Sequence, residues 1–160
     1  MYKHSTHMPM LLKVLRMTSG SVLELGVGWF STPVLHYTCM EMNRFLMSYD
    51  NDQRFIGKFK AFGNSMHKIE FIEDWDKADI LKPWSMAFID HAPGPRRGMD
   101  AGRLSQYAEY VVCHDSEEKH THTYEYDKIY ALFKYRWDYT KLWPHTVVLS
   151  NFHDLQGLKE

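Results

Sequence analysis

Short apolar runs alternate with longer mixed segments along most of this chain, and this alternation limits the fold more than any other feature. Five of the runs are predicted to be buried strands, at residues 21–26, 44–50, 67–74, 84–90 and 109–115. Repeated strand–helix alternation is typical of a parallel sheet with both faces covered. We therefore expect an α/β fold with a doubly wound, mostly parallel sheet and helices on both faces.

The segments between these runs are predicted to be mainly helical. The first helix lies within residues 7–20, where apolar residues have helical spacing, with Pro9 near the start and Gly20 near the end. Further helices are expected at 31–42, 51–63, 99–108 and 122–136, with at most a short one at 76–81. Ser31 or Thr32 is expected to cap the second helix. Residues 91–98 are predicted to form a long loop.

The chain ends in two aromatic-rich segments, 137–144 and 145–152, which turn at Pro144–His145. They are predicted to form an antiparallel hairpin at one edge, which makes a seven-stranded sheet. No repeat or long linker divides the sequence. We expect one domain over residues 1–160, with an N-terminal helix or lid at 1–20 and the core at 21–150.

Composition excludes several classes of protein. The net charge of −1 gives no general attraction to nucleic acid, so a nucleic-acid partner is not expected. Two cysteines, Cys39 and Cys113, are too few for a disulfide scaffold and fit the reducing cytoplasm. No apolar run reaches the ~18 residues of a membrane span, and residues 1–12 lack the apolar stretch of a signal peptide. A cytoplasmic protein without a membrane partner is expected.

The stretch VLELGVG at residues 22–28 is the first candidate ligand site. In doubly wound sheets, ligands bind beyond the carboxyl ends of the strands. Gly26 and Gly28 allow a tight turn and a close approach of the backbone to a ligand, while the next helix points its free amides there. Position 31 is Ser, so the third glycine of a dinucleotide fingerprint is missing. Asp50 ends the second strand and is suited to binding a ribose diol.

Four stretches in order along the chain together resemble the motifs of class I S-adenosylmethionine-dependent methyltransferases. They are VLELGVG, SYDND, EDWD and MAFIDHAP, and the resemblance covers about residues 20–150. It implies S-adenosylmethionine as the cofactor and a seven-stranded sheet whose last strand is antiparallel. The cofactor-binding residues that it implies are Glu24, Gly26, Gly28, Ser31, Thr32, Asp50, Asn51, Asp74, Trp75 and Asp90.

The resemblance also implies what these residues contact. Glu24 and the two glycines would line the methionine part of the cofactor. Asp50, with Asn51 beside it, would bind the ribose hydroxyls, although the motif leaves the choice between Asp50 and Asp52 open. Asp74 and Trp75 would flank the adenine. Asp90 would lie near the amino group of the methionine part or near the reacting centre.

The fourth and fifth predicted strands each end in an acid next to a histidine, which makes Asp90, His91, His114 and Asp115 the candidate catalytic residues. In one interpretation, Asp90 and Asp115, with His91 or His114 as a further ligand, hold a divalent cation that orients an oxygen acceptor. This is similar to the metal-dependent O-methyltransferases, although Ser116 stands where their Asn ligand would fall. In the other, His91 or His114 is a metal-free general base. A third interpretation makes these residues solvated or capping groups. A metal is possible but not favoured.

Two further groups of residues allow both a functional and a structural interpretation. Arg96 and Arg97 would bind a carboxylate or phosphate of the acceptor, or else belong to a solvated turn. Tyr126, Tyr130 and Phe133 have helical spacing and are expected in the core rather than around a substrate.

The sequence therefore predicts a methyltransferase that acts on an oxygen or nitrogen of an unidentified acceptor, with a small molecule favoured over a protein side chain. The alternative is a non-catalytic S-adenosylmethionine-binding or scaffold subunit. A nicotinamide-dependent enzyme is a third possibility, which the missing glycine disfavours. The cofactor-binding core leaves an acceptor exposed to water. Either the acceptor is large, or a second subunit covers the site, or the chain is the catalytic fragment of an assembly. The aromatic-rich hairpin offers an edge for a possible homo-oligomer.

Overall fold

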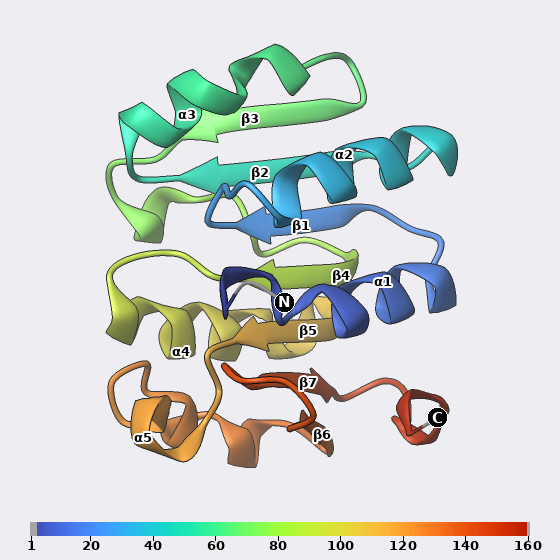
Figure 1. Cartoon of the computed structure of the whole chain (residues 1–160), viewed down its shortest axis with the longest axis vertical. Helices are drawn as coiled ribbons and strands as arrows, with labels where there is room; N and C mark the ends of the chain where they lie inside the picture. Colours follow the sequence, from blue (N-terminus) through green and yellow to red (C-terminus); the bar gives the residue numbers. More distant parts are fainter. Residues whose placement is uncertain (1–2, 160) are drawn as a thin grey trace.

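Seven strands form one mixed sheet in the computed structural model, which describes residues 3–159. The strand order is β3-β2-β1-β4-β5-β7-β6 (Figure 1). The strands are β1 Val22–Leu25, β2 Leu46–Asp50, β3 His67–Phe71, β4 Trp84–Ile89, β5 Ala108–His114, β6 Tyr135–Tyr139 and β7 Thr146–Ser150. Residues 1–2 of the predicted N-terminal segment and residue 160 of the predicted domain lie outside the described residues.

The pairing of the strands creates a crevice at the centre of the sheet. Strands β1 to β5 are parallel, and β7 runs antiparallel between β5 and β6. The chain first builds outward from β1 to β3, then returns to add β4 and β5 on the other side of β1. The order thus reverses between β1 and β4, which is where such sheets bind ligands. The predicted mostly parallel, seven-stranded α/β sheet is confirmed.

Helices cover both faces of this sheet (Figure 1). The α-helices are α1 Met8–Met17, α2 Ser31–Glu41, α3 Gln53–Phe59, α4 Gly94–Arg103 and α5 Glu118–Thr121. Short 3₁₀ helices occur at η1 Lys3–Ser5, η2 Lys60–Phe62, η3 Trp75–Lys77, η4 Leu104–Gln106, η5 Tyr126–Lys128, η6 Tyr130–Leu132 and η7 Gln156–Leu158. No helix within residues 3–159 combines the length and the apolar character that crossing a membrane requires.

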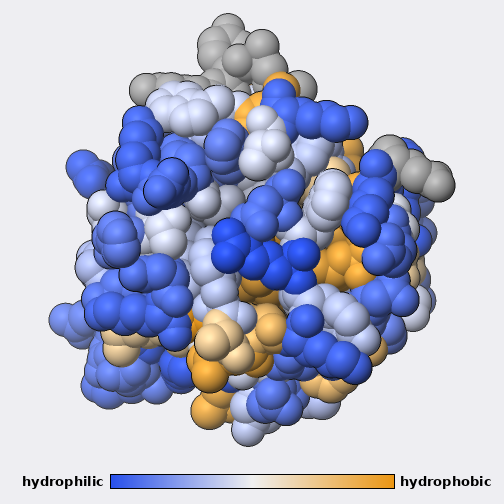
Figure 2. Space-filling model, turned by 90° about the horizontal axis from the view of Figure 1, so that it is seen from below, coloured by the Kyte–Doolittle hydropathy of each residue, from blue (hydrophilic) through white to orange (hydrophobic). Residues whose placement is uncertain are grey.

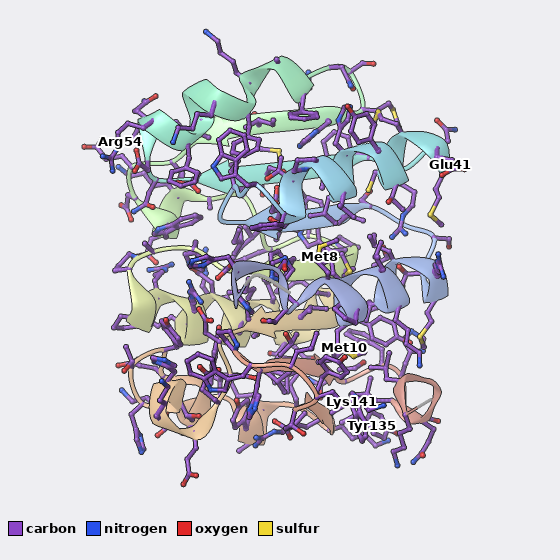
Figure 3. The ribbon with its side chains drawn as sticks, in the orientation of Figure 1. Met8, Met10, Glu41, Arg54, Tyr135 and Lys141 are labelled. Atoms are coloured by element: carbon purple, nitrogen blue, oxygen red, sulfur yellow. The ribbon has the colours of Figure 1, made fainter. Side chains whose placement is uncertain are left out.

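The core consists of two apolar clusters, one on each face of the sheet. Val22 of β1 packs in the cluster beneath α1 and α2, whereas Leu23 and Leu25 pack in the cluster beneath α4. Partly buried Met8 and Tyr135 complete the first cluster (Figure 3). Because both faces of the central strands are covered, these strands are nearly continuous apolar runs, which is why the sequence predicted them well.

The predicted helix over residues 122–136 is wrong. The structure has the single turn of α5, followed by η5 and η6, and Glu125 interrupts any longer helix with a φ of 57°. The expected burial nevertheless holds, because Tyr126 is completely buried and Phe133 is nearly so. Apolar spacing of about three residues is shared by α-helices and by successive 3₁₀ turns, so the spacing alone does not distinguish them.

Two predicted helix starts are also wrong. The expected loop at 91–98 is helical from Gly94, because Pro95 stands in the first turn of α4, where its missing amide costs no hydrogen bond. Phe30, not Ser31 or Thr32, is the N-cap of α2. Thr32 lies in the first turn and uses its hydroxyl for bonds to the β1 loop instead.

The strand β6 forms one edge of the sheet, at the lower end of the molecule in Figure 1, and Figure 2 views the molecule from that end. Hydrophilic side chains cover most of this end of the molecule, and an apolar area lies among them (Figure 2). Self-association through this edge stays a prediction.

Candidate functional site

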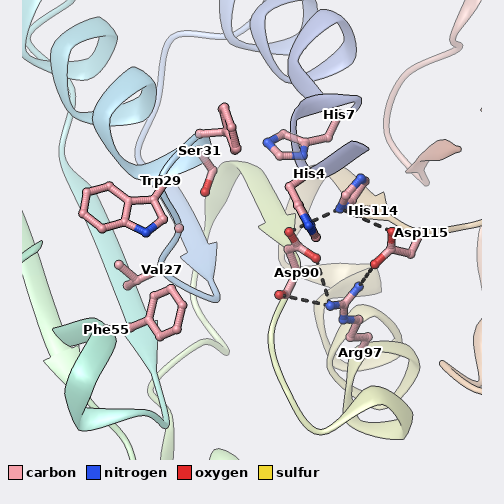
Figure 4. Close-up of a pocket in the computed structure, with 12 residues that line it drawn as sticks. His4, His7, Val27, Trp29, Ser31, Phe55, Asp90, Arg97, His114 and Asp115 are labelled. Atoms are coloured by element: carbon pink, nitrogen blue, oxygen red, sulfur yellow. Dashed lines mark hydrogen bonds and ion pairs between the residues drawn. The ribbon is translucent and has the colours of Figure 1, made fainter. Parts of the chain in front are cut away.

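A pocket of about 500 Å³ lies beyond the carboxyl ends of β1, β4 and β5, where the strand order reverses (Figure 4). One wall comes from the loop after β1 and from α3, and the other comes from the ends of β4 and β5 together with α4. The N-terminal residues His4 and His7 lie over the top of the second wall. The volume is in the range of ~300–1,000 Å³ that is usual for small-molecule sites.

The wall formed by the β1 loop and α3 is apolar and aromatic. Val27, Trp29 and Phe55 line it, and Trp29 is 62% exposed. The Trp29 ring is supported from behind by Phe59, with ring centroids 4.8 Å apart. A supported but exposed indole is suited to stacking against a flat ring of a ligand.

The opposite wall is charged and is organised around Arg97. The guanidinium bridges two acids, with Nη2 at 2.9 Å from Asp90 Oδ1 and Nη1 at 2.9 Å from Asp115 Oδ2 (Figure 4). It also lies over the Tyr124 ring, 4.4 Å from the centroid. Asp115 has a φ of 56°, a strained conformation that is tolerated best by Asp and Asn among non-glycine residues.

His114 connects this charged wall to the N-terminal segment. Its Nδ1 lies 3.3 Å from Asp90 Oδ2, and its Nε2 lies 3.0 Å from Thr6 Oγ1. Burial lowers the pKa of His114, but the hydrogen bond and the negative charge of Asp90 raise it more, so the pKa is above its usual value. Burial raises the pKa of Asp90, while His114 and Arg97 lower it below its usual value. The two side chains form a coupled acid–histidine pair that faces the pocket.

Gly26 is needed where the β1 loop meets the end of β4. Its φ is 98°, and a Cβ there would lie 2.7 Å from the backbone C and O of Asp90 and from the amide N of His91. The close approach is therefore between two parts of the protein, not between the loop and a ligand as the sequence suggested. Gly28 has no such restriction and lines the pocket directly, as does Ser31.

Comparison with known proteins adds the family context of this geometry. No family model and no curated protein matches the sequence. Among solved structures, human methyltransferase-like protein 13 in complex with SAH (S-adenosylhomocysteine) is similar with a TM-score of 0.65 and 12% identity, over 98% of this chain and 85% of that one. The SAH-bound methyltransferase PaMTH1 of Podospora anserina gives 0.61 and 12%, over 96% and 80%. A precorrin-6y C5,15-methyltransferase of Geobacter metallireducens gives 0.60 and 11%, over 88% and 85%.

The chain has the class I methyltransferase fold. Two of these structures carry SAH by their descriptions, which agrees with the cofactor that the motifs implied. At these identities the likeness is one of fold.

Within this methyltransferase fold, Glu24 does not line the pocket. Its side chain is fully buried and accepts hydrogen bonds from Thr32 Oγ1 at 2.9 Å and Ser48 Oγ at 2.6 Å. Thr32 Oγ1 in turn accepts the amide of Gly28 at 2.9 Å. Burial raises the pKa of Glu24 to about 7, although the hydrogen bonds oppose this rise. Glu24 and Thr32 therefore fix the shape of the glycine loop, and neither of them lines the pocket.

Asp50 has a similar structural use. Its two carboxylate oxygens accept the amides of Val27 and Asp52, each at 2.7 Å, so the end of β2 is tied to the β1 loop. Asp52 caps α3 and pairs with Arg54. Asn51 is half-buried, and none of these three residues at the end of β2 and after it lines the pocket. The ribose contact implied by the motif stays a prediction without support from this geometry.

Neither of the predicted adenine-binding residues, Asp74 and Trp75, lines the pocket. Trp75 is 5% exposed, its indole N–H donates to the Ala92 carbonyl at 2.9 Å, and its ring packs on His91. Asp74 caps η3 by accepting the amide of Asp76. Trp75 is a core residue because the chain folds back over it after β4, which the sequence does not reveal.

His91 was predicted to be catalytic and Arg96 to bind the substrate, but neither side chain faces the pocket. His91 is buried, with Nε2 at 3.0 Å from Asp100 Oδ2, and burial lowers its pKa. Arg96 pairs with Asp100 and Asp76. Neither lines the pocket, whereas their neighbours Asp90 and Arg97 do, because successive residues leave a strand or helix in different directions.

The two acids of the possible metal pair, Asp90 and Asp115, both contact Arg97. Arg97 lies between Asp90 and Asp115 and neutralises both, so a cation shared by these two acids would have to displace a guanidinium.

Sequence reasoning missed the aromatic wall and the N-terminal histidines. Trp29 directly follows Gly28, so its place in the loop was a usable signal. His4 and His7 come from a segment with no motif, and only the structure brings them to the site.

Proposed function

We propose that this protein transfers a methyl group from S-adenosylmethionine to an oxygen or nitrogen of an acceptor molecule. The observation that carries the proposal is the pocket at the reversal of strand order, with an aromatic wall opposite the Asp90–His114 pair. The methyltransferase fold supports it. The alternative of a non-catalytic subunit is not favoured, because a titratable pair faces the pocket.

The residues of the pocket fit the chemistry of this cofactor. When bound, S-adenosylmethionine supplies an electrophilic methyl group on a sulfonium. Trp29 and Phe55 offer flat apolar surfaces for the adenine of the cofactor. The backbone of Gly28 and the hydroxyl of Ser31 line the pocket as polar groups.

The chain's own contribution to methyl transfer is to orient the acceptor and to hold its proton. His114 Nδ1 is within reach of Asp90, whose negative charge stabilises the protonated imidazole. An acceptor hydroxyl or amine that binds between Asp90 and His114 can pass its proton to Nδ1 of the imidazole as the methyl group arrives. Thr6 fixes the orientation of the imidazole through Nε2. The acceptor is a small molecule or a protein side chain that reaches into the pocket.

Calorimetry with S-adenosylmethionine and SAH tests the cofactor part of the proposal. We expect binding by the wild type and a loss of affinity of at least ~fivefold in Trp29→Ala, because stacking on an aromatic side chain contributes about 1–3 kcal/mol. Trp143→Ala is the matched control, since Trp143 is also half exposed but does not line the pocket. Absence of binding in the wild type would overturn the proposal.

A screen for SAH release tests turnover. A library of hydroxyl, phenol and amine acceptors is incubated with S-adenosylmethionine and the protein, and SAH is quantified. We expect release with at least one acceptor, and a large loss of kcat in His114→Asn with cofactor affinity retained. Binding without release across the library would favour the non-catalytic alternative.

A further inference from the structure

His7 is a buried histidine whose ring nitrogens have no hydrogen-bond partner among the described residues. It is only 2% exposed, and both Nδ1 and Nε2 are unsatisfied. Its ring packs against Phe88 and against the edge of the His114 ring, with centroids 4.7 Å apart in both cases. Buried polar groups in native proteins nearly always have partners, so this imidazole requires an explanation.

The orphaned imidazole lies beside two further potential metal ligands. One ligand atom each from His7, Asp90 and His114 lie within 4.8 Å of one another. Figure 4 shows that the three side chains converge from the N-terminal segment and from the ends of β4 and β5. They border the pocket, so a group that they hold together would face its interior.

Hydrogen bonds and an ion pair already hold His114 and Asp90 in orientations that suit metal binding. The Nε2 of His114 lies against Thr6 Oγ1 and can donate its proton there, while the proton that Nδ1 shares with Asp90 is released when a metal ion takes its place. A second hydrogen bond that fixes the tautomer is typical of metal-bound histidines. Arg97 holds the other oxygen of Asp90, which leaves Oδ2 directed toward the histidines.

We propose that His7, Asp90 and His114 bind one divalent transition-metal ion. Two imidazoles and one carboxylate suit zinc or ferrous iron, whereas calcium and magnesium prefer oxygen ligands only. With metal–ligand bonds of about 2.1 Å, ligand atoms lie roughly 3–3.5 Å apart, so the site closes by about 1 Å around the ion. Three protein ligands leave coordination positions open to the pocket, where an oxygen atom of a ligand or a water molecule binds.

This metal site stands on the geometry of the three side chains and does not rest on the proposed methyl transfer. Its ligand set differs from the one that the sequence suggested, because Asp115 is held by Arg97 and His7 takes its place. In the metal-bound protein, the Nδ1 lone pair of His114 is used by the ion. The ion then lowers the pKa of a bound hydroxyl or water in place of a histidine base.

Zinc binding to the full chain tests the site without any acceptor or cofactor. Calorimetry with Zn²⁺ after removal of metal by a chelator should give one site per chain. Co²⁺ should give a visible absorption band that Zn²⁺ displaces. Asp90→Asn, His114→Gln and His7→Phe should each weaken Zn²⁺ binding by ~100-fold or more, since even outer partners of metal ligands contribute 10–100-fold.

Matched variants separate a ligand from a nearby residue. His7→Phe keeps the aromatic packing on Phe88, so its circular dichroism and thermal unfolding should match those of the metal-free wild type. His4→Ala removes an exposed histidine of the same segment and pocket, and it should bind Zn²⁺ as the wild type does. Thr6→Val should weaken binding by ~10-fold or more, because it removes the partner of His114 Nε2.

The outcomes are distinct. One site that is lost in His7→Phe and kept in His4→Ala supports the proposal. No saturable Zn²⁺ binding, or binding that is unchanged in His7→Phe, overturns it. SAH binding measured on the same samples reports separately on the proposed function.

Discussion

The buried carboxyl of Glu24 predicts an unusual pH dependence of stability. Its pKa rises from 4.5 to about 7 in the folded chain, because burial disfavours the charged form. The folded protein therefore holds a proton that the unfolded chain has already released. This contribution to the free energy of unfolding is fully present below the unfolded pKa and is lost as the pH rises through the folded one.

The size of the effect follows from the pKa shift. Each pH unit between the two pKa values corresponds to ~1.4 kcal/mol, so the contribution of Glu24 falls by about 3 kcal/mol between acid pH and about pH 8. Glu24→Gln removes this term. Its amide stays neutral, its oxygen can still accept from Thr32, and its NH₂ group can donate to the Ser48 hydroxyl oxygen.

Urea unfolding of the wild type and of Glu24→Gln over this pH range provides the assay. Because other buried groups also titrate, the informative quantity is the difference between the two proteins at each pH. The free energy of unfolding of the wild type relative to Glu24→Gln should fall by about 3 kcal/mol as the pH rises from 4.5 to about 8. Glu70→Gln, at an exposed position of β3, controls for the loss of a carboxyl and should change stability by less than ~0.5 kcal/mol.

A difference that stays constant with pH would refute this reasoning. It would mean that Glu24 is ionised throughout the range and that the hydroxyls of Thr32 and Ser48 compensate fully for burial.

Three further substitutions have clear expected outcomes. Gly26→Ala should reduce the free energy of unfolding by ~3 kcal/mol or more, because its Cβ would meet the backbone of Asp90 and His91 at 2.7 Å and its φ is 98°. The control Gly57→Ala has nothing within 4 Å of the new Cβ and should be neutral or stabilising by up to ~1 kcal/mol. Equal urea midpoints for the two variants would contradict the close approach. Asp50→Asn should reduce the free energy of unfolding by about 1–3 kcal/mol, because the backbone amide of either Val27 or Asp52 loses its acceptor. Hydrogen exchange of these two amides should become faster, and unchanged protection would contradict the two hydrogen bonds. Arg97→Gln should reduce the free energy of unfolding by about 1–3 kcal/mol at neutral pH, because Asp90 and Asp115 lose their shared cation. A urea midpoint equal to that of the wild type would show that water compensates the two acids when the guanidinium is removed.

The strands and the position of the site could be predicted because they depend on local sequence. The runs around Leu23 and Phe88 are buried on both faces, so they have to be apolar throughout. The reversal of strand order then directs attention to the carboxyl ends, where Asp90, His114 and Asp115 do converge. A glycine pair after the first strand was likewise a sound indication of the loop.

The use of each polar side chain could not be predicted in this way. Asp50 and Trp75 match motif positions, yet one binds backbone amides and the other packs in the core. The helical spacing around Tyr126 produced buried aromatic residues without a long helix, since tertiary packing decided the turns.

The amino-acid sequence by itself determined the layered α/β fold, because the alternation of apolar and mixed segments leaves few other ways to bury these strands. Only the tertiary structure decided which groups meet at the pocket. His7 reaches Asp90 and His114 because α1 packs across β4 and β5, a contact between residues far apart in the chain. Hydrogen bonds and close approaches of this kind depend on distances of a few ångströms between separate elements, and no local pattern of residues encodes them.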